Sequence, residues 1–177
     1  MKQTLVFTAI LAIFFAACTT RTNPNASTDS SDIIDTSKYY YIISVNSGKN
    51  LDVEGGSVEN GVKLIQYSNN GYDNQRFKFK LHADGAYSIM CKKSGLFLDV
   101  FENSIEDGAP IVQWQYSGND NQKFEVLVQK DGSVIFICKH SDKSFDIKSA
   151  SLDDGATLIQ WINSGGANQK FKLEIAL

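Results

Sequence analysis

Three groups of polar and aromatic side chains recur along this chain at one spacing. Each group has an aspartate, an aromatic residue fifteen positions later, and an Asn-Gln pair that begins seven positions after the aromatic. The groups are Asp52, Tyr67, Asn74 and Gln75; Asp99, Trp114, Asn121 and Gln122; and Asp146, Trp161, Asn168 and Gln169. Strands need apolar residues to pack and glycine to turn, but they do not need this set. Its recurrence predicts binding chemistry.

These residue types suit a sugar ring. An aromatic side chain covers the apolar C–H face of the ring. An ionised carboxylate accepts hydrogen bonds from two neighbouring hydroxyls, and an asparagine amide both donates and accepts. The set therefore predicts a shallow hexose site in each repeat, up to three in all. The second and third should be stronger, because Trp covers more of a sugar ring than Tyr does.

Each residue type also has a purely structural interpretation. The aspartate could cap a turn, and Trp114 and Trp161 could be buried core residues. In Asn-Gln-x-Phe, the phenylalanine is expected in the core and the glutamine on backbone groups. Only the coincidence of all three types in every copy favours a site.

The elements that carry these residues repeat without a gap. A step of 47 residues relates the aspartates, and the same step relates four further sets: Ser47, Ser94 and Ser141; Gly61, Gly108 and Gly155; Gln66, Gln113 and Gln160; and Gly71, Gly118 and Gly165. The residue pattern of each unit predicts four short strands divided by turn residues. In the first unit these strands are Tyr39–Asn46, Leu51–Glu54, Lys63–Ser68 and Arg76–Ala83. A three-bladed propeller would fall below the usual four to eight blades. We therefore predict an all-β fold of twelve strands, a β-trefoil with pseudo-threefold symmetry.

From Tyr39 to Leu177 the sequence resembles the ricin-B-type lectin family, through Leu-Asp-Val, Gln-Tyr and Asn-Gln-Arg-Phe in the first repeat and their counterparts in the others. The resemblance implies that Asp and Asn hydrogen-bond the sugar, that the aromatic stacks on it, and that the Gln after Asn orients the site. Galactose-type ligands are the family's most familiar case.

The chain departs from the family in two respects. It lacks the cysteines of the intra-repeat disulfide, and it has Ile65, Val112 or Ile159 where many members place a sugar-facing Gln. A Gln stands one position later instead. Because adjacent strand residues face opposite ways, Gln66, Gln113 and Gln160 are expected to be structural.

Other functions find little support in the sequence. The balance of 17 basic and 20 acidic residues argues against nucleic acid as the main partner. His82 and His140 do not occupy equivalent positions in the repeats. The acidic pairs Glu106-Asp107 and Asp153-Asp154 are expected to be solvated charges in loops. No metal-ligand spacing is present, so we expect no enzyme activity, metal or cofactor. The competing interpretation is a protein-binding trefoil such as a protease inhibitor, but the loops are short and equal in length.

The N-terminus resembles a bacterial lipoprotein signal. Lys2 precedes an apolar run from Leu5 to Phe15, which is too short to span a bilayer, and small residues precede Cys18. We expect a signal peptide at 1–17, lipidated Cys18 with a flexible linker to residue 37, and a domain at 38–177 (repeats 39–85, 86–132 and 133–177). Ordinary secretion is the alternative. The expected location is the cell envelope at the outer membrane, with the membrane face left open.

Cys91 and Cys138 occupy the same place in successive repeats, where the first repeat has Ser44. Each lies among alternating apolar residues, so two small buried thiols are expected. A disulfide between the two repeats is the alternative.

Overall fold

A computed structural model of the chain describes residues 33–176; the predicted signal peptide, Cys18 and most of the predicted linker lie outside the described residues. The described part is all β, with short 3₁₀ turns, and no helix in it is long and apolar enough to cross a bilayer. Its twelve strands are β1 (Tyr39–Ser44), β2 (Asn50–Val53), β3 (Leu64–Tyr67), β4 (Phe77–Leu81), β5 (Tyr87–Cys91), β6 (Phe97–Val100), β7 (Ile111–Trp114), β8 (Phe124–Val128), β9 (Val134–Cys138), β10 (Ser144–Ile147), β11 (Leu158–Trp161) and β12 (Phe171–Ile175).

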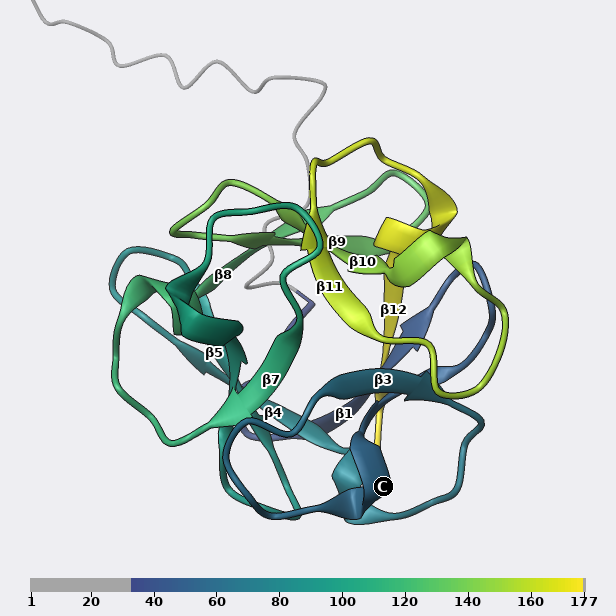
Figure 1. The fold of residues 1–177 in the computed structure, drawn as a ribbon, viewed down its shortest axis with the longest axis horizontal. Coiled ribbons are helices and arrows are strands. Elements are labelled where there is room, and N and C mark those ends of the chain that lie inside the picture. Colours follow the sequence, from purple (N-terminus) through teal and green to yellow (C-terminus); the bar gives the residue numbers. More distant parts are fainter. Residues whose placement is uncertain (1–32, 177) are drawn as a thin grey trace, which may run out of the picture.

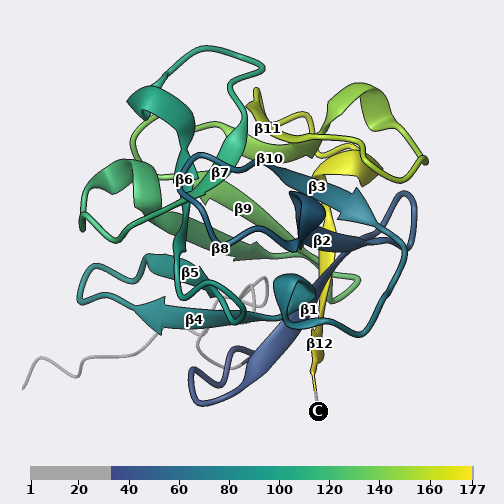
Figure 2. The same cartoon turned by 60° about the horizontal axis from the view of Figure 1, so that its bottom comes forward.

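Six strands close into a barrel. Antiparallel pairs run from β1 through β4, β5, β8, β9 and β12 and back to β1. Figure 2 shows several of these strands below the remaining hairpins. Closure leaves no unpaired edge along the barrel, which is how the fold avoids edge-to-edge association.

The other six strands form three hairpins that cap one end: β2–β3, β6–β7 and β10–β11. In Figure 1 the labelled strands β3, β7 and β11 surround the centre of this cap. Single bridges join neighbouring hairpins, at Lys63 with Val112, Ile65 with Thr157 and Pro110 with Ile159. The predicted β-trefoil is therefore confirmed.

The core follows the repeat. The phenylalanines of the three Asn-Gln-x-Phe motifs, Phe77, Phe124 and Phe171, are fully buried, as expected. Phe136 packs against Phe145 and Phe171 of its own repeat, with ring centroids 5.2 and 5.8 Å away, and stacks on Phe79 of the first repeat at 6.1 Å. Cys91 and Cys138 are buried free thiols, and burial raises the pKa of the Cys138 thiol.

Three fully buried glutamines tie the repeats together in a ring. The amide of Gln66 donates to the carbonyls of Ser151 and Asp153 in the third repeat, both at 2.9 Å. Gln113 makes the same two bonds to the first repeat, and Gln160 makes them to the second. Each side-chain oxygen accepts from a serine hydroxyl of its own repeat, Ser47, Ser94 or Ser141. The prediction that these glutamines are structural is confirmed.

Two details of the sequence-based outline change. The strands are shorter than predicted, β1 ending at Ser44 and β4 at Leu81. The end of the segment expected to be a linker packs on the domain: Ile34 is buried in the core, and the backbone N–H of Asp35 donates to the Tyr40 hydroxyl at 2.8 Å. An isolated Ile-Ile pair in a polar stretch gave little indication of this packing.

We predict that Gln160→Ala lowers the free energy of unfolding by about 2–4 kcal/mol, because two backbone carbonyls and the Ser141 hydroxyl lose a buried partner. Denaturant titration measures this change. The matched control is Gln129→Ala, whose amide donates only to the carbonyl of Leu127 in an exposed contact two residues earlier in the chain. That variant should change stability by less than about 0.5 kcal/mol. Equal effects in the two variants would contradict the structural role.

Candidate functional site

Strand register brings the aspartate and the aromatic residue of each repeat to one face of its hairpin. Asp52 on β2 pairs with Ile65 on β3, so Tyr67, two residues further on, shares their face. The same register pairs Asp99 with Val112 and Asp146 with Ile159. The residue two before each aromatic therefore lies beside the carboxylate, and Ile65 and Ile159 contribute apolar surface to the first and third sites.

A buried glutamine holds each carboxylate in place. The Gln75 amide donates to Asp52 Oδ2 at 2.8 Å, and Gln122 and Gln169 donate to Asp99 and Asp146 at 2.9 Å. The second N–H of each amide donates to a backbone carbonyl seven residues earlier. All three glutamines are fully buried. They position the carboxylate and do not themselves reach a ligand.

The asparagines come from the 3₁₀ turns that follow. Asn74 and Asn121 donate to the carbonyls of Val53 and Val100, at 3.3 and 3.4 Å. Asn168 makes the equivalent contact with Ile147 at 3.4 Å and also donates to Asp146 Oδ2 at 2.8 Å. All three therefore lie beside the aspartate of their own repeat, as the spacing predicted.

The aromatic side chains face solvent. Tyr67, Trp114 and Trp161 are 42%, 40% and 44% exposed, which excludes their interpretation as buried core residues. Trp114 lies over Gly61 of the preceding repeat, where a Cβ would stand 3.2 Å from the indole. Gly108 lies in the same way under Trp161, at 3.6 Å. Gly61 (φ +80°) thus serves both a left-handed turn and the close approach of the ring.

The three sets line three separate depressions of unequal size. Their volumes are about 840, 340 and 730 Å³ in the first, second and third repeats. The turn after β2 explains part of the difference: it holds Gly55-Gly56 in the first repeat, and Glu102-Asn103 or Ser149-Ala150 in the others. All six residues have positive φ, so the glycines also avoid the strain that the other four carry.

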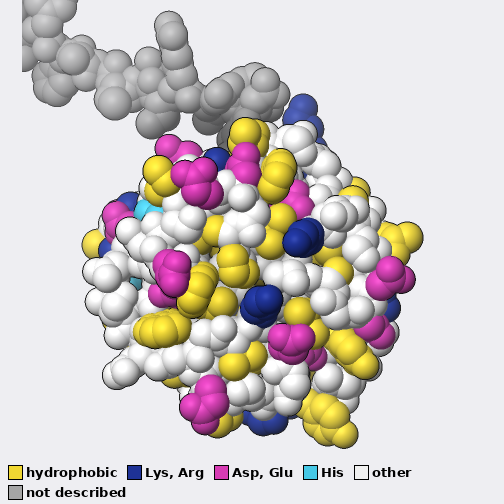
Figure 3. Space-filling view, viewed as in Figure 1, with side chains coloured by type: hydrophobic (Ala, Val, Ile, Leu, Met, Phe, Trp, Pro, Cys, Tyr) yellow, Lys and Arg dark blue, Asp and Glu magenta, His cyan; other side chains and the backbone are white. Residues whose placement is uncertain are grey.

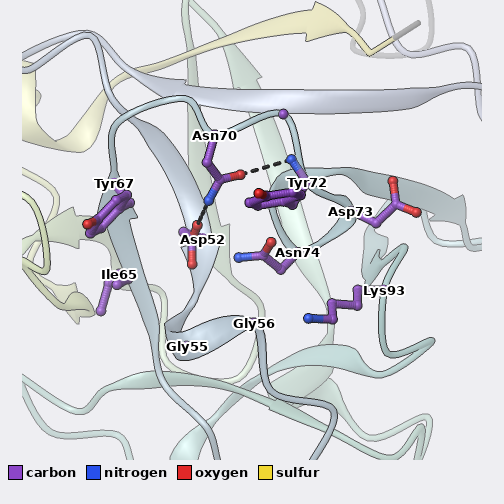
Figure 4. Close-up of a pocket in the computed structure, with 11 residues that line it drawn as sticks. Asp52, Gly55, Gly56, Ile65, Tyr67, Asn70, Tyr72, Asp73, Asn74 and Lys93 are labelled. Atoms are coloured by element: carbon purple, nitrogen blue, oxygen red, sulfur yellow. Dashed lines mark hydrogen bonds between the residues drawn. The ribbon is translucent and has the colours of Figure 1, made fainter.

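The first depression holds residues that the sequence did not single out (Figure 4). Asn70 donates to Asp52 Oδ2 at 3.2 Å, and its oxygen accepts from the backbone N–H of Tyr72 at 2.9 Å. Tyr72 is 69% exposed, and Lys93 enters from the following repeat. At the second site the counterparts of Asn70, Tyr72 and Lys93 are Ser117, Asn119 and His140. Because the residue types at these positions differ between repeats, the repeat pattern did not mark them as site residues.

Burial changes the acidity of the three aspartates. Desolvation raises the pKa of Asp52, Asp99 and Asp146 above the ordinary value of 3.8, and hydrogen bonds from the Gln and Asn amides partly offset this. Burial thus disfavours the charged form of each carboxylate, and the hydrogen bonds from neighbouring amides favour it. The same amides hold each carboxylate in one orientation, ready to accept further hydrogen bonds.

The remaining titratable residues of interest occupy other places. Asp154 and Asp107 form ion pairs with Lys49 and Lys143, at 2.6 and 2.7 Å. His82 contacts the Ser88 hydroxyl at 2.9 Å, and burial lowers its pKa. On the face seen in Figure 3, acidic and basic side chains are interspersed rather than gathered by sign. Among residues 33–176, no group of three His, Cys, Asp or Glu could hold a metal ion.

Comparison with known proteins agrees with this geometry. A family model described as ricin-type beta-trefoil lectin domain-like matches residues 32–114 and 73–161. The designed threefold-symmetric protein ThreeFoil is 42% identical with a TM-score of 0.76, over 78% of this chain and 98% of that one. A search of curated proteins gave no match.

Two natural proteins are also similar. The exo-beta-1,3-galactanase 1,3Gal43A from Clostridium thermocellum is 34% identical with a TM-score of 0.77, over 80% of this chain but only 31% of the galactanase. The C-half of an earthworm R-type lectin, solved with GalNAc, is 25% identical with a TM-score of 0.61, over 78% of this chain and 98% of that one.

We predict that NMR titration of the carboxyl carbons gives pKa values above 3.8 for Asp52, Asp99 and Asp146. Asp131, whose pKa is lowered by hydrogen bonds from Ser133, serves as the control. Since the folded-state pKa of each site aspartate is raised, its contribution to stability is fully present below the unfolded pKa and is lost as pH rises through the folded one. Site values at or below that of Asp131 would contradict the assigned burial.

Proposed function

Because the chain belongs to the ricin-type β-trefoil lectin-like family, we propose that it is a non-catalytic lectin with up to three sugar sites, each built by one repeat. The observation that carries this proposal is the repeated carboxylate geometry. In every repeat the hydrogen bonds from neighbouring amides go to Oδ2 of the aspartate, beside an exposed aromatic ring. These bonds leave Oδ1 of each aspartate as the oxygen that, in this proposal, accepts from the sugar.

Each group then has a distinct role. The aspartate accepts from two sugar hydroxyls, the asparagine adds a further polar contact, and Tyr67, Trp114 or Trp161 stacks on the apolar ring face. The buried glutamines fix the carboxylate before the ligand arrives, which lowers the entropy lost on binding. Shallow sites of this kind bind weakly one at a time.

Two relatives support a proposal for the ligand class. One is a galactanase that acts on a β-1,3-linked galactan, and another was solved with GalNAc. A galactose-type hexose is therefore the proposed ligand. We further propose that acylated Cys18 anchors the domain in the bilayer of the cell envelope, where three sites on one rigid body hold a repeating glycan by multivalency.

We predict that Asp99→Ala combined with Asp146→Ala reduces galactoside binding to a single site, measured by calorimetric stoichiometry. Adding Asp52→Ala should abolish binding, because each site then lacks its hydroxyl acceptor. Asp131→Ala removes the same charge from a turn between β8 and β9 and should leave binding unchanged. Galactoside binding that survives in the triple variant would refute the site assignment.

We also predict that Trp114→Ala and Trp161→Ala each weaken one site while the fold is retained, since both side chains are exposed to solvent and lie outside the core. An aromatic stacking contact is worth about 0.5–1.5 kcal/mol, or roughly two- to tenfold in affinity. Calorimetry with a galactoside measures the affinity of each site. Equal affinity of the second and third sites in wild type and in the double Trp variant would contradict the stacking role.

Binding should also weaken on acidification, because the ionised aspartate is the acceptor. Since the pKa values of Asp52, Asp99 and Asp146 are raised, the loss should begin at a higher pH than an ordinary aspartate would give. Calorimetry across pH 3–7 measures the midpoint, with circular dichroism as the control for folding. Binding that is independent of pH while the protein stays folded would exclude the carboxylates.

A further inference from the structure

We propose that the first site is selective for acidic sugars, hexuronic acids in particular, and that Lys93 is its specificity-determining residue. The inference rests on the proposed lectin function and adds a ligand class to one of its sites. It starts from a position at which the three repeats differ. A step of 47 residues relates Asn46, Lys93 and His140, and each lies beside the site of the repeat that precedes it around the ring.

At two of the three sites this side chain contacts a backbone carbonyl in or next to the turn that follows the aspartate strand. Asn46 donates to the carbonyl of Ala150 at 2.9 Å, beside the third site. His140 Nε2 lies 2.9 Å from the carbonyl of Ser104, beside the second. Both residues thus complete the wall of a neighbouring site with a backbone contact.

Lys93 instead extends toward Gly56 and Asn74 in the first site (Figure 4). Its amine lies 2.7 Å from the point where a Cβ on Gly56 would stand, and the Asn74 side-chain carbon lies 3.6 Å from the same point. Only glycine leaves this space, because Asn103 and Ala150 occupy the equivalent position in the other repeats. The lysine amine therefore lies beside the asparagine that belongs to the site.

The charge of Lys93 is not used elsewhere in the described part of the chain. Its neighbour Lys92 pairs with Asp73 at 3.1 Å, and Arg76 pairs with the same oxygen at 2.8 Å. Lys93 takes part in none of the ion pairs among residues 33–176, and Asp52 is the carboxylate whose acidity it affects. Lys93 is therefore the one cation among the residues that line this site, and of the two carboxylates in the lining, Asp52 and Asp73, the second is already paired with Lys92 and Arg76.

The second site differs in that no lysine or arginine lines it. Its depression is lined by Asp99 and Glu102, two carboxylates, and has less than half the volume of the first. An anionic ligand would be repelled there, whereas a hexuronic acid at the first site can present hydroxyls to Asp52 and its carboxylate to Lys93. Lys148 lines the third site at a different position of the turn, so the first and second sites give the clearest contrast.

The test uses proteins with one site each. Asp99→Ala with Asp146→Ala keeps the first site, and Asp52→Ala with Asp146→Ala keeps the second. Calorimetry compares methyl β-galactoside with methyl β-galacturonide, which differ only at C6. At the first site we expect the uronide to bind about fivefold more tightly, a preference that 0.5 M NaCl weakens. At the second site we expect the neutral sugar to bind more tightly.

Lys93→Met in the first-site protein should bring the two affinities to parity, and the control Lys130→Met, an exposed lysine in the β8–β9 turn, should keep the preference. Neutral sugar bound as tightly as uronide at the first site, or a preference that survives Lys93→Met, would overturn this inference alone. Failure of both ligands to bind the wild-type protein and both single-site proteins would overturn the lectin function as well.

Discussion

The ring of buried glutamines is the constraint on which the rest of this structure depends. A single repeat cannot bury its own hairpin, and Gln66, Gln113 and Gln160 join each hairpin to the turn of another repeat through two backbone carbonyls. Leaving those groups unpaired in the interior would cost about 1–3 kcal/mol each. The bonds run from the first repeat to the third, from the third to the second and from the second to the first. The ring is complete only when all three copies are present.

The same glutamines decide where the aromatic residues point. Since neighbouring strand residues face opposite ways, burying Gln66 turns Tyr67 outward, onto the face that carries Asp52. A second set of glutamines then holds the carboxylate from below, as Gln75 does for Asp52 at 2.8 Å. Burying a charged carboxylate without such hydrogen-bond donors would cost folding free energy. The site is therefore rigid in the absence of ligand, and its rigidity comes from the amides that build the fold.

Much of this could be predicted from the sequence, because repetition carries information that a single segment does not. The recurrence of Gln66 at a step of 47 residues indicated twelve strands, and strand alternation indicated which glutamines were structural. The sequence could not predict Ile34 in the core, since one buried residue in a polar stretch has no periodicity. It also could not place Lys93 at the first site. That residue comes from the next repeat, and its type is not repeated, so only the three-dimensional closure brings it there.

Threefold symmetry of the backbone does not imply three equal sites. The positions that hold the fold together, such as Gln66 and Phe77, have the same residue type in each repeat because the same buried contact must be made three times. The rim positions meet solvent, where a change of side chain costs little stability. Gly56, Asn103 and Ala150 are equivalent in the backbone, yet only Gly56 leaves room for a lysine amine beside the asparagine of its site. A trefoil of this kind can therefore vary the charge and volume of each site while the amides beneath them stay unchanged.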